Sequence, residues 1–228
     1  MQKATSTTAR PVTAISLTTA RLSMVSAITF LILVAALHFI KPELDPSWRL
    51  ISEYAIGDYG WIMMVAFLFL ALSSLSLFVA VRSHIRTIGG YIGLAVLLIS
   101  ATGTIIAAFN AIDPLTANPN EITAHGNLHG LGSMLGIPTF PIAAVLISWS
   151  LTRNPAWSST QRSLLWAASF TWIGLVIMFG SLFIMLGQSG KFGPDVMIGW
   201  PNRLLVVTYC AWLITVAWLV DRLRGQAP

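Results

Sequence analysis

Six long stretches of apolar residues run through the chain, and together they decide which folds it can adopt. Because an α-helix rises 1.5 Å per residue, about 20 apolar residues cross the roughly 30 Å of hydrocarbon in a bilayer. A transmembrane β-strand would instead alternate apolar and polar residues over about ten positions. The stretches are Leu22–Ile40, Trp61–Val81, Ile88–Phe109, Leu128–Leu151, Leu164–Gly187 and Leu204–Val220. The sequence therefore predicts an all-α, polytopic integral membrane protein, built as a bundle of six transmembrane helices.

The scarcity of charge excludes several classes of protein. Only 9% of the 228 residues are charged, whereas a soluble domain carries about 25%. A soluble enzyme, a disordered chain and a conventional nucleic-acid binder are excluded, and no nucleic-acid partner is expected despite the net charge of +5. The single cysteine, Cys210, lies in an apolar stretch and cannot form an internal disulfide.

Basic and acidic residues fall on opposite sides of the predicted bundle. With a cytoplasmic amino terminus, the inner segments hold Lys3, Arg10, Arg21, Arg82, Arg86, Arg153, Arg162, Arg222 and Arg224, and the outer ones hold Lys41, Arg49, Lys191 and Arg203. The outer segments also hold Glu43, Asp45, Glu53, Asp58, Asp113, Glu121 and Asp195, which leaves Asp221 inside. Cytoplasmic loops carry an excess of Lys and Arg. We therefore expect a multi-pass protein of the plasma membrane with both termini in the cytoplasm.

The predicted spans set the domain organisation. Residues 1–21 are rich in Thr, Ser and Ala and lack acids, and we expect them to form a flexible cytoplasmic tail. Residues 22–222 form a single six-helix membrane domain. Residues 223–228 form a short cytoplasmic tail.

Two histidines four residues apart are the sharpest candidate site. In a helix, His125 and His129 would share one face, and such a pair can ligate a metal ion such as Zn²⁺. Asp113, at the end of the third stretch, is the best third ligand, and His38 is a weaker one. The alternative is a polar network at the membrane interface that holds no metal.

Two further segments carry polar residues on the same side. Glu53 serves either as an acid or base in the site, or as an acid near a helix amino terminus capped by Ser52. Tyr54 and Asp58 are candidates for contact with a ligand or a lipid headgroup. Arg203, which precedes an apolar run, should find a partner in Asp113 or Glu53, or else contact a lipid phosphate.

Prolines interrupt the fourth stretch. Pro138 and Pro141 lie in its middle, where a missing N–H leaves backbone carbonyls without their helical partners. Such a break can form a substrate site, although a kinked structural helix is the commoner outcome.

With these segments the chain resembles the bacterial and archaeal membrane family called domain of unknown function 998. The resemblance rests on Ser52-Glu53-Tyr54 with Gly57–Trp61, Asp113-Pro114, the His125/His129 pair followed by Pro138 and Pro141, and Gly199–Arg203. Asn202 departs from the Gln or Glu expected at its position. The resemblance implies a six-helix prokaryotic membrane protein, and it implies no established reaction.

Three functions follow as hypotheses. The first is a non-enzymatic role in transport, sensing or as an accessory subunit, with the bilayer as partner and a lipid or small molecule bound on the extracytoplasmic side. The second is a zinc-dependent lipid hydrolase or transferase at the outer leaflet, with Glu53 as base and Arg203 on a phosphate. The third is a b-type haem protein, with the haem held between His38 and His129.

Overall fold

The computed structural model describes residues 14–223, and in this range all regular secondary structure is helical, without strands. Its elements are α1 (Ala14–Ile40), η1 (Ile51–Ala55), α2 (Gly60–Val81), α3 (Ile88–Phe109), η2 (Pro119–Glu121), α4 (Ala124–Gly136), α5 (Thr139–Thr152), η3 (Pro155–Thr160), α6 (Gln161–Ser189) and α7 (Gly199–Leu223). Six segments of this part are long and apolar enough to cross a membrane, and the fourth comprises both α4 and α5. The predicted membrane-protein class and six-helix bundle are confirmed.

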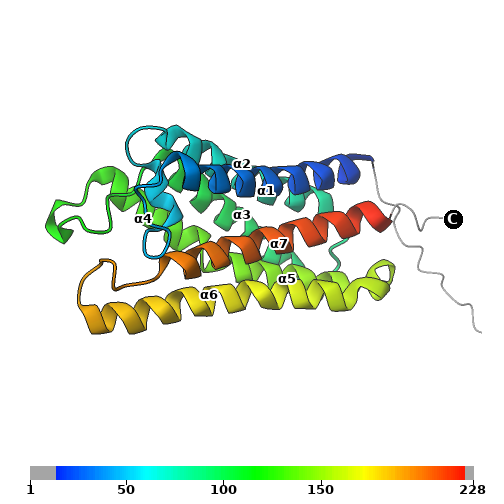
Figure 1. Cartoon of the computed structure of the whole chain (residues 1–228). Coiled ribbons are helices and arrows are strands. Elements are labelled where there is room, and N and C mark those ends of the chain that lie inside the picture. Colours follow the sequence, from blue (N-terminus) through cyan, green and yellow to red (C-terminus); the bar gives the residue numbers. More distant parts are fainter. Residues whose placement is uncertain (1–13, 224–228) are drawn as a thin grey trace, which may run out of the picture.

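The six spans form a ring. Neighbours in the chain pack against one another, and α7 closes the ring by packing against α1. The start of α1 and the end of α7 lie at the same end of the bundle, which we call the terminal end (Figure 1). There the Arg21 Nε donates to Asp221 at 2.8 Å. The opposite, distal end holds the connections of residues 41–59, 110–123 and 190–198.

The first helix begins earlier than the apolar stretch that predicted it. It starts at Ala14 rather than Leu22, so part of the segment expected to be a flexible tail is helical. The remaining residues of the two predicted tails, 1–13 and 224–228, lie outside the described range.

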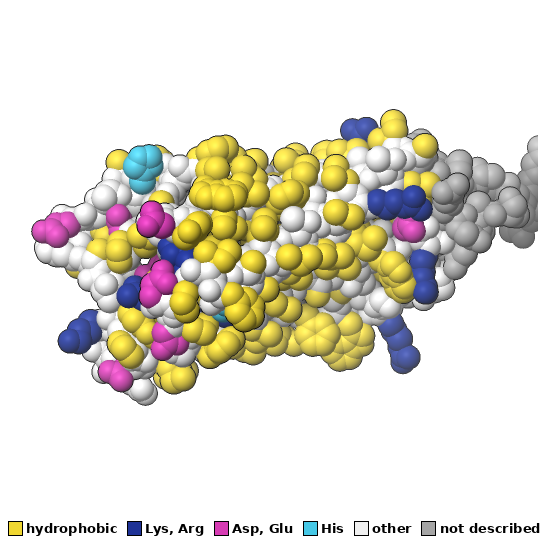
Figure 2. Space-filling view, turned by 45° about the horizontal axis from the view of Figure 1, so that its top comes forward, with side chains coloured by type: hydrophobic (Ala, Val, Ile, Leu, Met, Phe, Trp, Pro, Cys, Tyr) yellow, Lys and Arg dark blue, Asp and Glu magenta, His cyan; other side chains and the backbone are white. Residues whose placement is uncertain are grey.

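Charged side chains lie at the two ends of the bundle, and apolar side chains cover its middle (Figure 2). All seven acids that the sequence grouped together lie in or beside the distal connections, and Asp221 lies near the terminal end. The predicted grouping of the acids at one end is therefore confirmed.

The fourth span breaks where its prolines predict. Because Pro141 has no N–H, the carbonyl of Ile137 lacks its helical donor, and it accepts a hydrogen bond from the Tyr209 hydroxyl at 2.7 Å instead. The carbonyl of Gly136 accepts from the Ser100 hydroxyl at 2.8 Å. The kink is confirmed, and side chains of α3 and α7 satisfy the freed carbonyls.

Glycines hold α4 against α3. A Cβ on Gly103 would collide with the backbone of Gly132 and Gly136, and one on Gly132 would collide with the backbone of Gly103 and Ala107. Small residues allow such backbone contact in membranes. The two helices are thereby fixed at close range, which positions the residues of α4 described below.

A buried histidine lies in the α2–α3 connection at the terminal end. The His84 ring packs edge-on against Trp157 of η3, with 5.5 Å between centroids, and its backbone carbonyl accepts from Asn154 at 3.1 Å. Burial, together with the nearby charge of Arg86, lowers the pKa of His84. This histidine is therefore neutral at pH 7 and part of the packing of that end.

The glycine contact predicts a strong effect of a small change. Gly103→Ala should lower the free energy of unfolding by about 2 kcal/mol, since overpacking of this size costs 1–3 kcal/mol. Gly180→Ala is the matched control, because a Cβ there meets nothing within 4 Å, and alanine favours the helix by about 0.5–1 kcal/mol. Unfolding titrations in mixed micelles measure both. Equal stabilities for the two variants would contradict the contact.

The break at Pro141 predicts that the cost of removing the Tyr209 hydroxyl depends on which residue stands at position 141. Tyr209→Phe should keep the stacking on Phe140 but leave the Ile137 carbonyl unpaired, at a cost of about 1–3 kcal/mol. In a Pro141→Ala background the new N–H faces that carbonyl, so the same tyrosine change should cost less than about 1 kcal/mol. A double-mutant cycle of unfolding free energies tests this. Additive effects would show that the two groups do not share the carbonyl.

Candidate functional site

A buried arginine organises the distal end. Arg203, in the first turn of α7, donates through Nε to His38 Nε2 at 2.7 Å and through Nη2 to the Tyr54 hydroxyl at 3.1 Å. Its Nη1 donates to the carbonyls of Arg49 at 2.7 Å and Gly199 at 3.0 Å. The side chain therefore joins α1, η1 and α7 through neutral acceptors. The expectation that Asp113 or Glu53 pairs with Arg203 is wrong.

The two hydrogen bonds of His38 establish which of its ring nitrogens carries the hydrogen. Its Nδ1 lies 2.7 Å from the Val34 carbonyl, which can only accept, so Nδ1 carries the hydrogen. Its Nε2 accepts from Arg203 and is therefore unprotonated. Both nitrogens of His38 are in use within the protein, so in this arrangement neither is free to bind a haem iron.

Glu53 ties two connections together. It is fully buried, its Oε1 accepts from Arg49 at 2.7 Å and from the Leu115 N–H at 3.1 Å, and its Oε2 accepts from the Leu50 N–H at 3.1 Å. This pairing of a buried charge with a cation and backbone donors is what burial requires. Glu53 acts here as a structural link between the connections of residues 41–59 and 110–123. Ser52 lies within η1 rather than capping α2.

Other charges at this end also have local partners. The Lys41 ammonium donates to the carbonyls of Tyr54 and Ile56. The Ser47 N–H donates to Asp45 at 2.9 Å, and this hydrogen bond lowers the pKa of Asp45. Asp58, a predicted ligand contact, is exposed. The connection of residues 41–59 is thus folded around its own charged side chains.

Asp113 and His125 fix the start of α4. The carboxylate of Asp113 accepts from the Thr123 N–H at 2.8 Å and its hydroxyl at 3.1 Å, and Thr123 in turn caps α4 by accepting from the Gly126 N–H. His125 is exposed, with its Nδ1 3.0 Å from Asn110 Oδ1. Asp113 and Thr123 thus hold the start of α4, and His125 is hydrogen-bonded to the end of α3 beside it.

The predicted metal ligands are not brought to one point. His129 is buried and turns its Nδ1 to α3, while His125 and Asp113 have the separate partners given above. Across residues 14–223, no three His, Cys, Asp or Glu side chains are placed to hold a metal ion. This arrangement gives the zinc hypothesis no ligand set.

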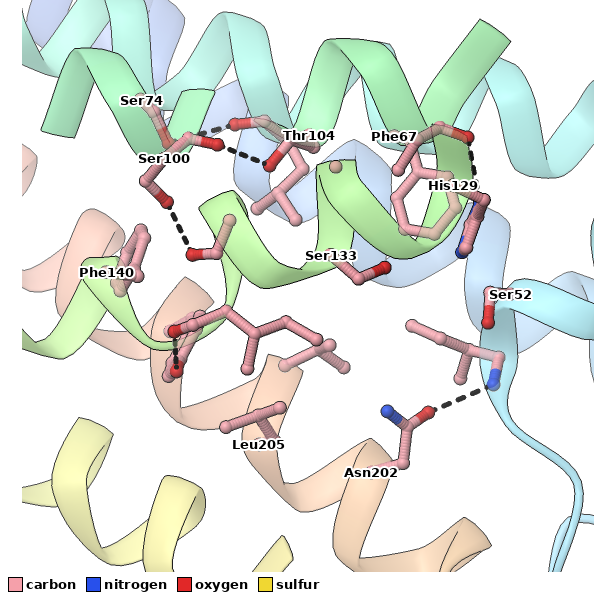
Figure 3. Close-up of a pocket in the computed structure, with 18 residues that line it drawn as sticks. Ser52, Phe67, Ser74, Ser100, Thr104, His129, Ser133, Phe140, Asn202 and Leu205 are labelled. Atoms are coloured by element: carbon pink, nitrogen blue, oxygen red, sulfur yellow. Dashed lines mark hydrogen bonds between the residues drawn. The ribbon is translucent and has the colours of Figure 1, made fainter. Parts of the chain in front are cut away.

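A cavity of about 80 Å³ lies beside this network, between α2, α3, α4 and α7. Its lining runs from Ser52 and Asn202 at the distal end to Phe140 near the middle of the bundle (Figure 3). From Asn202 to Tyr209 the cavity extends about 10 Å along α7, at 1.5 Å per residue.

Four polar groups face the distal part of this cavity without partners among the described residues. His129 donates through Nδ1 to the carbonyls of Asn110 at 2.8 Å and Ala107 at 3.2 Å, so in the neutral imidazole its Nε2 is an acceptor. Asn202 accepts from the Ile51 N–H through Oδ1 at 3.0 Å, which leaves its amide N–H groups as donors. The hydroxyls of Ser52 and Ser133 complete the set (Figure 3).

The deeper part of the cavity offers an apolar surface. The hydroxyls of Ser100, Thr104 and Tyr209 donate to backbone carbonyls and have no hydrogen left for a ligand. Around them lie Leu70, Ile137, Phe140, Leu205 and Val206. The cavity is therefore polar at its distal end and apolar below.

Comparison with known families gives one match. The family described as "Protein of unknown function (DUF998)" matches residues 24–219, which is most of the chain. The chain belongs to this family. Neither the curated proteins nor the solved structures provide a match.

In this DUF998 protein, the segments that carried the resemblance meet at the distal end. Ser52, His129 and Asn202 line the cavity, and Arg203 follows Asn202 in α7. The break at Pro141 frees the Ile137 carbonyl that Tyr209 bonds in the deeper part. Of the predicted site residues, the cavity includes His129 alone. Sequence reasoning missed Ser133 and the role of Asn202, and the proline break was the signal that could have located the cavity.

The arginine network predicts that lysine cannot replace Arg203. Lysine lacks the planar fork that reaches four acceptors, so Arg203→Lys should cost at least about 2 kcal/mol of unfolding free energy, since bonds to a charged group contribute about 1.5–3 kcal/mol each. Arg162→Lys, at an exposed position of α6, is the matched control and should change little. Unfolding titrations compare the two. Similar stabilities would contradict the role given to Arg203.

Proposed function

We propose that this protein binds a small uncharged amphiphile in the cavity between α2, α3, α4 and α7, in the extracytoplasmic half of the cell membrane. The observation that carries the proposal is the set of unpaired polar groups at the distal end of an apolar cavity. Buried polar groups are normally hydrogen-bonded, so an acceptor at His129 and donors at Asn202 favour a ligand that supplies the missing partners.

The ligand's polar end should be uncharged. No Lys, Arg, Asp or Glu side chain lines the cavity, and the nearest charges, Arg203 and Glu53, are already bonded to protein groups. A buried ion without a partner costs far more than a buried hydroxyl. A hydroxyl or ester head with an apolar chain fits the lining best.

The distribution of basic residues supports the orientation. Among the described residues, the terminal end carries Arg21, Arg82, Arg86, Arg153, Arg162 and Arg222, and the distal end carries Lys41, Arg49, Lys191 and Arg203. Of the distal four, Lys41 and Arg203 are buried, so the exposed positive charge is concentrated at the terminal end. By the positive-inside rule, that end faces the cytoplasm.

The biochemical role is transport, sensing or service as an accessory subunit rather than catalysis. Glu53, His125 and His38, which were first considered for catalysis or metal binding, are used in structural contacts. In each of these roles the cavity recognises the ligand. In a sensor or accessory subunit the bound ligand is the signal, and in a transporter it is the cargo.

A photoreactive analogue of monobutyrin tests the proposal. Incubated with the protein in nanodiscs and irradiated, it should label α4 and α7. Ser133→Leu fills the cavity and should reduce labelling at least about fivefold, equivalent to about 1 kcal/mol of binding free energy.

Two controls complete this experiment. Ser169→Leu makes the same change at an exposed position of α6 and should label like the natural protein. Photoreactive butyrate, which is anionic, should label far less than the neutral probe. Equal labelling of the two serine variants, or of both probes, would overturn the proposal.

A further inference from the structure

The ring of spans is not closed evenly along its length. In the terminal half, α5 packs along α6. In the distal half the fourth span is represented by α4, which packs against α3 and meets α5 where the two join. Packed helices approach to 8–10 Å between their axes, and α4 and α6 do not pack in this way. We call the space between α4 and the distal half of α6 the α4–α6 seam.

Burial along α6 follows the same division. Leu164 and Ala168, in the terminal half, are 0% and 2% exposed. Phe179, Leu182 and Leu186 lie on the same side of the helix by its 3.6-residue period, yet they are only partly buried. One apolar stripe is thus covered where α5 faces it and left partly open along the seam.

The cavity lies behind this seam. Ser133 of α4 and Val206 of α7 belong to its walls, and α6 packs on α7. Towards the distal surface the cavity is covered by η1, whose Ile51 is bonded to Asn202 and whose Glu53 is held by Arg49. The covered distal side and the open seam favour access from the side of the bundle.

We infer that the ligand reaches the cavity sideways from the membrane hydrocarbon, through the α4–α6 seam. Its head occupies the cavity, and its apolar chain remains in the seam. This inference rests on the proposed function and narrows the ligand to a single-chain amphiphile dissolved in the membrane. The cavity, about 10 Å long and about 80 Å³ in volume, holds the head and the first part of a chain. The rest of a longer chain must leave through the seam.

Two probes separate the cavity from the seam. The photoreactive monobutyrin has a chain of only four carbons and extends least beyond the cavity, whereas monopalmitoylglycerol with the photoreactive group at its chain end must extend far out of it. In the natural protein the long probe should label the facing sides of α4 and α6, around Phe179 and Leu182.

A bulky residue in the seam should affect only the long probe. Gly130 lies about 60° round α4 from Ser133, on the side away from Gly132 and α3, and a Cβ there meets nothing within 4 Å. Gly130→Trp should reduce labelling by the long probe about tenfold, equivalent to the loss of about 1.4 kcal/mol, and leave labelling by the short probe unchanged.

The controls make each outcome decisive. Gly187→Trp, at an exposed glycine of α6 on the side away from the stripe, should leave both probes unaffected. Met134→Trp, one turn further along the seam side of α4 and 75% exposed, replaces Gly130→Trp if that variant does not fold. Unchanged labelling of the Trp variants by the long probe would overturn lateral access. Failure of the short probe in the natural protein would overturn the cavity itself.

Discussion

The constraint on which the structure most depends is that a backbone carbonyl freed inside the membrane must find a donor within the protein. Pro141 removes one helical hydrogen bond from the fourth span, and the carbonyls of Ile137 and Gly136 accept from Tyr209 and Ser100 instead. These bonds tie the break to α7 and α3. They also use up the hydroxyls of the deeper cavity, which is why that part offers an apolar surface.

At the distal end, the groups that need partners are buried charged side chains rather than backbone carbonyls. Its buried cations are bonded mainly to carbonyls, a hydroxyl and a neutral imidazole, and its one fully buried acid has a cation and two backbone donors. The buried charged groups thereby have their hydrogen-bond partners beside the cavity, and none of them lines it. The polar groups that remain unpaired, led by His129 and Asn202, are neutral, and this gives the site its chemical character.

Length and hydrophobicity were enough to predict six spans, because crossing hydrocarbon demands long apolar helices whatever their packing. The grouping of acids and the break at Pro138 and Pro141 could also be predicted from the sequence.

The partners of Arg203 could not be predicted, since they depend on how the connection of residues 41–59 folds back over α7. Ser133 was missed because a lone serine in a transmembrane helix gives no signal until its facing helices are known. The zinc hypothesis rested on a spacing that brings His125 and His129 onto similar faces. In the structure the Nδ1 atoms of both rings are hydrogen-bonded to Asn110, that of His125 to its side chain and that of His129 to its carbonyl.

The bonds of Arg203 have a consequence for the order in which the molecule is assembled. Its acceptors belong to α1 and to the connection that follows it, whereas the arginine belongs to the last span. Synthesis proceeds from the amino terminus, so the first connection is made long before Arg203 and Asn202 exist to hold it. The distal end therefore reaches its final form only after the sixth helix is inserted, and completion of the chain becomes the step that creates the cavity.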